Sequence, residues 1–125
     1  ISALVLVGLH LNDLETCRLQ LRTAPAIARE LGCTFVNTLP RKIGLTHDEA
    51  FRRLADLWRE EGSRFRDAGL TVTAENHTIN PDPDEDIFLL RQSGDFDRLL
   101  EVTSGGIKIK YDPAWLMWGD EDPLP

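Results

Sequence analysis

Cysteine is scarce in this sequence, with Cys17 and Cys33 the two thiols among 125 residues. They have no metal-ligand spacing and are too few for a disulfide scaffold, so we expect a reducing, cytoplasmic location. Basic residues are also few: 14 Lys and Arg stand against 21 Asp and Glu, and the formal net charge of −7 disfavours partners such as nucleic acid or an acidic membrane. The longest apolar run, residues 1–11, is too short to span a bilayer and follows no basic region, which predicts neither a transmembrane helix nor an intact signal peptide.

The remaining composition, 42% hydrophobic and 28% charged, is that of a single globular domain over residues 1–125. Short β-type runs alternate with longer stretches of helical period. The four β-type runs are Ala3–Leu11, Thr34–Leu39, Leu70–Glu75 and Ile107–Asp112. The last three begin 36 and 37 residues apart, about the length of a strand plus a returning helix. This alternation predicts βα units and a parallel sheet.

The first two connections carry the signals of a helix start. Asn12 is followed by Glu15 at the spacing of a capping box. The same spacing joins Thr46 to Glu49. Pro25 lies inside the first helical stretch, where it removes a backbone donor, so we expect it to kink that helix or divide it in two.

The third connection is less regular. A loop is predicted over residues 81–84, which alternate proline and aspartate. Two short helices, Glu85–Gln92 and Asp95–Val102, are then expected on either side of Gly94.

Successive residues of a strand point to opposite faces, which sorts the side chains of the last two strands. The residues of one face are apolar: Leu70, Val72, Ala74, Ile107, Ile109 and Tyr111. Those of the other face are polar: Thr71, Thr73, Glu75, Lys108, Lys110 and Asp112. One apolar face and one polar face ending in carboxylates fit an α/β fold of the (β/α) TIM-barrel type, with about four βα units, better than a doubly wound sheet.

Glu75 and Asp112 end neighbouring strands of this predicted sheet, so their carboxylates are expected to converge. Two anions at close range need a proton or a cation between them, and a hard divalent metal with oxygen ligands meets that need. The alternative is an interior ion pair between Lys110 and one of these carboxylates, which would leave no place for a metal.

Four further residues at or after strand ends are candidates for substrate binding: His10, Asn37, His77 and Trp115. Each also has an ordinary structural interpretation. His10 could be a core histidine, His77 an exposed loop residue, and Trp115 part of a hydrophobic cluster.

The motif Glu75-Asn76-His77, followed by Asp112-Pro113 after 37 residues, resembles the xylose-isomerase-like TIM barrel superfamily of sugar phosphate isomerases and epimerases. The resemblance implies that Glu75 and Asp112 bind a divalent metal, Mn²⁺ or Mg²⁺ first and Zn²⁺ or Co²⁺ second. It also implies that Glu75 is catalytic, taking a proton next to a sugar carbonyl to give an enediolate.

The same resemblance places this chain in the central part of the barrel only. A closed barrel of this type needs roughly 250 residues, so we expect either a fragment of a longer product or a half-barrel that pairs. Its partner would be the remainder of the same barrel or another copy in a homo-oligomer. Trp115 stands where the family usually has histidine.

Three functions follow in order. The first is a metal-dependent sugar or sugar phosphate isomerase or epimerase. The second is a non-catalytic barrel relative that acts as a binding or assembly module, with Lys110 in place of the metal and Trp115 filling the pocket. The third, disfavoured by the acidic charge, is a DNA repair enzyme of the endonuclease IV type.

Overall fold

The computed structural model describes residues 4–112, which form four parallel strands in the order β1-β2-β3-β4. The strands are β1 (Leu4–Val7), β2 (Phe35–Thr38), β3 (Thr71–Glu75) and β4 (Ile107–Lys110). Three helices connect them in turn: α1 (Leu14–Leu31), α2 (His47–Asp67) and α3 (Ser93–Val102). The α/β fold built from βα units is therefore confirmed.

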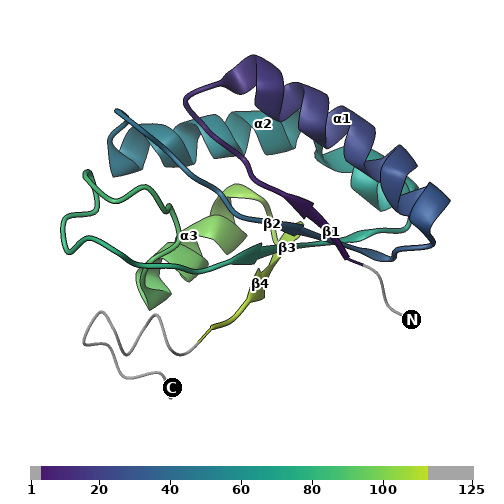
Figure 1. Ribbon diagram of the computed structural model, residues 1–125. Helices are drawn as coiled ribbons and strands as arrows, with labels where there is room; N and C mark the ends of the chain where they lie inside the picture. Colours follow the sequence, from purple (N-terminus) through teal and green to yellow (C-terminus); the bar gives the residue numbers. More distant parts are fainter. Residues whose placement is uncertain (1–3, 113–125) are drawn as a thin grey trace.

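The hydrophobic core lies between the helices and one face of the sheet, and α1 and α2 pack side by side over it (Figure 1). Val36, Val72 and Ala74 on this face are buried. We call the opposite side the open face, because Leu6 and Phe35 there are 64% and 47% exposed. One row of paired residues crosses the open face from strand to strand: Leu6, Asn37, Thr73 and Lys108.

The helix boundaries confirm part of the sequence prediction. Thr46 is the N-cap of α2, and its hydroxyl accepts the backbone N–H of Glu49 at 3.2 Å. The cap of α1 is Asp13, one residue after the predicted Asn12, and its carboxylate accepts the backbone N–H of Thr16 at 3.1 Å.

Of the two effects predicted for Pro25, a kink or a division of the helix, division is wrong, because α1 runs unbroken from Leu14 to Leu31. Leu21, Ala24 and Ala28 on either side of the proline are buried against the sheet and α2. This packing outweighs the backbone hydrogen bond that the proline removes.

The predicted helix over Glu85–Gln92 is also wrong: residues 85–92 belong to the long loop between β3 and α3, and α3 begins at Ser93. The loop satisfies its backbone groups through distant partners instead of through helical hydrogen bonds. The N–H of Lys42 donates to the carbonyl of Ile87 at 2.8 Å, and the N–H of His77 donates to the carbonyl of Leu90 at 2.9 Å.

No helix within residues 4–112 combines the length and the hydropathy that a membrane span requires.

Candidate functional site at the carboxyl ends of the strands

Glu75 is the last residue of β3, and its carboxylate is at the centre of a cluster of polar side chains at the edge of the open face. Oε2 accepts a hydrogen bond from Nδ2 of Asn37 at 3.2 Å and lies 3.3 Å from Nζ of Lys110. Oε1 lies 3.7 Å from Nε2 of His77. The Glu75 side chain is 21% exposed, so it is largely shielded by these neighbours while still in contact with solvent.

The position of Asn37 follows from strand register, because Asn37 pairs with Thr73, two residues before Glu75. Its Oδ1 accepts a hydrogen bond from the Thr73 hydroxyl at 2.9 Å, which leaves Nδ2 to donate to Glu75. Asn37 is only 1% exposed, so the amide is fixed at both ends. An amide held in this way orients the carboxylate that it contacts.

Asn76 joins the ends of β3 and β4. Its Oδ1 accepts the backbone N–H of Asp112 at 2.7 Å, and its Nδ2 donates to the carbonyl of the same residue at 2.9 Å. The Asn76 side chain is fully buried. This double hydrogen bond keeps Asp112 next to the strand that carries Glu75, although sequence reasoning gave Asn76 no role.

His77 packs against Phe88, which in turn contacts Arg41, and sequence reasoning selected neither of these two residues. Its ring stacks on Phe88 with 4.7 Å between the ring centroids, and the guanidinium of Arg41 lies 5.7 Å from the centroid of Phe88. Among the contacts within residues 4–112, Nε of Arg41 is buried without a hydrogen-bond partner. Its position three residues beyond Thr38, the buried last residue of β2, is the signal that could have drawn attention to Arg41.

The backbone of His10 forms an isolated β-bridge with Arg41, which places His10 next to the contact between Arg41 and Phe88. The side chain of His10 is exposed, and its carbonyl accepts the Cys17 thiol at 3.1 Å. The structure thus brings Asn37, His77 and Lys110 to Glu75. His10 follows β1 and is linked to Arg41 instead of to Glu75. Trp115 lies outside the described residues.

Two carboxylates, those of Asp86 and Asp95, support the loop that carries Phe88. Asp86 and Arg91 form a pair with Nε to Oδ2 at 2.9 Å, in which the side chains are 0% and 4% exposed. Asp95 accepts a hydrogen bond from Nε2 of His47 at 2.7 Å and another from the backbone N–H of Arg91 at 2.9 Å. Burial favours the neutral form of Asp95, but these hydrogen bonds outweigh it and lower the pKa of the carboxyl below its usual value.

The side chains at the strand ends partly fit a divalent metal. Carboxylates such as those of Glu75 and Asp112 are the oxygen ligands that Mg²⁺ and Mn²⁺ prefer. Within residues 4–112, however, no three or more side chains of the ligating types are arranged to hold a metal. The chemistry of the donors fits, and a complete coordination shell needs ligands from beyond the described residues.

No family model and no curated protein sequence matches this chain. Solved structures do. L-ribulose 3-epimerase is similar with a TM-score of 0.72 and 15% identity, over 94% of this chain and 43% of that chain. A sugar phosphate isomerase/epimerase from Parabacteroides distasonis has a TM-score of 0.64 and 15% identity, over 95% of this chain and 45% of that one. An AP endonuclease of family 2 from Brucella melitensis has a TM-score of 0.56 and 14% identity, over 84% of this chain and 46% of that chain.

These neighbours are TIM barrels, the fold class that the sequence predicted. The chain therefore has the fold of a part of such a barrel and spans less than half the length of these solved structures. In a barrel of this kind, catalytic groups lie at the carboxyl ends of the strands, which is the edge that carries Glu75.

Proposed function

We propose that the chain is the central part of a divalent-metal-dependent isomerase or epimerase that acts on a sugar or sugar phosphate. The observation that carries the proposal is the position of Glu75. This carboxylate ends β3 at the catalytic edge of the fold, and Asn76 holds the neighbouring Asp112 at the end of β4. The similarity to L-ribulose 3-epimerase and to a sugar phosphate isomerase/epimerase supports the same class of reaction.

In this proposal Glu75 and Asp112 are metal ligands, and a bound divalent ion supplies Lewis acidity toward the carbonyl and hydroxyl of the sugar. Glu75 takes the proton from the carbon next to the carbonyl, which gives an enediolate. Asn37 holds the carboxylate in its orientation during this transfer, because its own amide is fixed by Thr73. His77 lies beside Glu75 and is positioned to contact a sugar hydroxyl.

Lys110 gives the non-catalytic alternative its one specific support, since its ammonium already lies 3.3 Å from Glu75. A fixed ion pair of this kind would neutralise the carboxylate without a metal. The Lys110 side chain is 49% exposed, however, and can turn to solvent without opening the core. We therefore place the lysine second to the metal, as a group that competes for the same oxygen.

The test measures metal binding by the intact protein. We expect about one Mn²⁺ per chain by calorimetry, and at least a roughly tenfold loss of affinity in Glu75→Gln and in Asp112→Asn. Asp97→Asn, an exposed carboxylate on α3, is the matched control and should bind as the wild type does. Lys110→Met should raise the affinity, because it removes the competing cation. Proton exchange next to the carbonyl of a ketose, followed by NMR in D₂O, reports the catalytic step.

Absence of bound Mn²⁺ in both the wild type and Lys110→Met would exclude the metal enzyme and favour the binding or assembly module. The related nuclease function remains third, because the net charge of −7 opposes binding to DNA.

We also propose that further strands cover the open face, either from the remainder of the same barrel or from a second copy. Leu6 and Phe35 are large apolar side chains left in solvent on this face, and both edges of the sheet are unpaired within the described residues. Sedimentation and calorimetry of this chain alone test whether the open face needs a cover. A monomer that melts cooperatively would contradict the proposal. The two buried free cysteines support a reducing, cytoplasmic location for the protein.

A further inference from the structure

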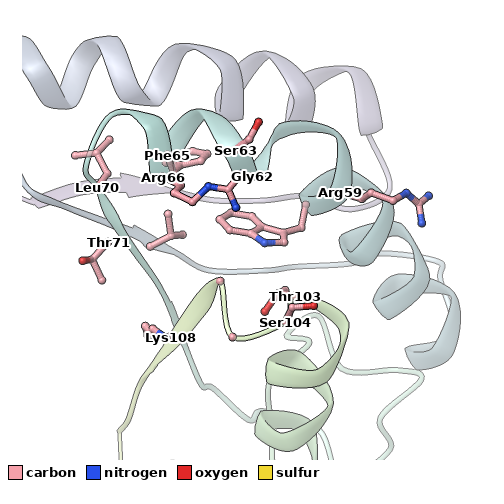
Figure 2. Close-up of a pocket in the computed structure, with 14 residues that line it drawn as sticks. Arg59, Gly62, Ser63, Phe65, Arg66, Leu70, Thr71, Thr103, Ser104 and Lys108 are labelled. Carbon is pink, nitrogen blue, oxygen red and sulfur yellow. The ribbon is translucent and has the colours of Figure 1, made fainter.

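A cavity of about 530 Å³ lies at the end of the sheet opposite to Glu75 (Figure 2). Its lining comes from three places: the C-terminal half of α2, the beginning of β3, and the turn over residues 103–106 that leads into β4. Parallel strands separate their two ends, so this cavity at the amino ends is distinct from the candidate site at the carboxyl ends.

The charges in this cavity have one sign. Its lining contains Arg59, Arg66 and Lys108 and includes no carboxylate, in a chain whose formal net charge is −7. Arg59 is paired with Asp56 at 2.6 Å and lies at the far end of the cavity from Lys108 in Figure 2. Neither Arg66 nor Lys108 has an ion-pair partner anywhere in residues 4–112. Two cations thus face the same hollow without a counter-charge.

One wall of the cavity is a rigid aromatic surface formed by Trp58. A Cβ atom on Gly62 would lie 2.7 Å from the indole ring, and one on Gly106 would lie 2.5 Å from it. The ring therefore fits between two glycines, and it also stacks on Phe65 with 5.8 Å between ring centroids. Because the indole is fixed before any ligand arrives, a ligand that packs on its remaining surface orders no side chain there.

The end of α2 explains only one of the two cations. Arg66 is in the last turn of that helix, where a positive charge offsets the partial negative charge of the helix C-terminus. Lys108 is on β4, and its ammonium lies 3.9 Å from the position of a Cβ on Gly105, in the turn that ends α3 and borders the cavity. The two charges therefore come from different elements, α2 and β4, and meet at one cavity.

We propose that this cavity binds a small organic anion, with a phosphate or carboxylate group at Arg66 and Lys108 and an apolar part against Trp58. Its volume is in the range of small-molecule sites, which is roughly 300 to 1,000 Å³. A mixed lining of aromatic, aliphatic and cationic side chains matches a ligand that is apolar at one end and charged at the other.

The probes are phenyl phosphate, benzoate and the neutral benzyl alcohol, titrated into the intact protein. Trp115→Phe and Trp118→Phe in this chain leave Trp58 as its reporter of fluorescence. We expect a saturable change with at least one anion. Arg66→Gln combined with Lys108→Gln should weaken that binding by roughly tenfold or more, because charge-assisted hydrogen bonds to the anion are lost. The anion with the higher affinity identifies the preferred group.

Two controls separate this site from its surroundings. Arg29→Gln removes the same charge from an exposed position on α1 and should leave the titration unchanged. Glu75→Gln should also leave it unchanged, so the result does not depend on the proposed function.

Three results would overturn the proposal. They are no saturable change with either anion, equal affinity for benzyl alcohol, and undiminished binding by the double variant. If Arg66→Gln lowers the melting temperature while the double variant binds the anion as before, the cations serve the helix end alone.

Discussion

Asp86 is the residue whose replacement should most disturb the loop beside the candidate site. Its Oδ2 accepts Nε of Arg91 at 2.9 Å and the backbone N–H of Ile79 at 3.2 Å, while Oδ1 accepts the backbone N–H of Phe88 at 3.0 Å. Arg91 in turn donates to the carbonyl of Asn80 at 2.7 Å. The Asp86 carboxylate therefore ties Ile79 to Arg91 across the loop. It also holds the backbone of Phe88, whose ring stacks on His77.

The magnitude follows from burial. Because the Asp86 and Arg91 side chains are 0% and 4% exposed, Asp86→Ala would leave a buried guanidinium without its counter-charge. Removing one partner of such a pair costs about 3–5 kcal/mol in the free energy of unfolding. For a domain of 125 residues, each kcal/mol corresponds to about 3–5 °C in melting temperature, so we expect a fall of roughly 9 °C or more.

The assay is urea unfolding of the intact protein, carried out as a double-mutant cycle with Arg91→Met. The double variant should lose less stability than the sum of the two single variants, since it buries no unpaired charge. The control is Arg52→Ala at the exposed pair with Glu49, which should cost less than about 1 kcal/mol. A loss below about 1 kcal/mol in Asp86→Ala, or strictly additive single losses, would refute this account of the loop.

Two further predictions concern titratable groups. Asp95→Asn should lower the free energy of unfolding at pH 7 by about 1–3 kcal/mol. Since the folded pKa of Asp95 is depressed, its contribution is present above the unfolded value of about 3.9 and is lost as the pH falls through the folded pKa. Urea unfolding at pH 7 and pH 3 should show the gap between wild type and variant closing at the lower pH, and an equal gap would contradict this sign. Burial raises the pKa of the Cys17 thiol to about 11, so about one molecule in a thousand carries a thiolate at pH 8. In a Cys33→Ser background, Ellman's reagent should label Cys17 only after unfolding, and rapid labelling of the native protein would exclude a closed core at this position.

Much of the fold was predictable because its signals are local. Alternating or continuous apolar residues locate all four strands, and Thr46 marks the start of α2 by its own hydrogen bond. The polar face of β3 and β4 was assigned from parity alone, and it led directly to the approach of Lys110 to Glu75.

The wrong predictions concern segments whose backbone conformation is determined by contacts with residues distant in the sequence. Residues 85–92 have the composition of a short helix, yet their carbonyls and N–H groups pair with the loops after β2 and β3. No local pattern reveals that Asp86 and Arg91 meet inside this loop. For the same reason, sequence reasoning found the candidate residues on the strands but missed Phe88, which meets His77 only in the folded loops, and Arg41, which lies against Phe88. The roles assigned to the site residues stay predictions.

The row of paired residues across the open face changes in polarity from β1 to β4. It begins with the hydrocarbon of Leu6, passes through the amide of Asn37 and the hydroxyl of Thr73, and ends at the ammonium of Lys108. Asn37 in the middle of the row is 1% exposed, and its amide is already bonded to Thr73 and Glu75, so this part of the row offers solvent little polar surface. The apolar end differs, because Leu6 and the neighbouring Phe35 remain in water. Elements that covered the face would therefore remove the most apolar surface from water over β1 and β2.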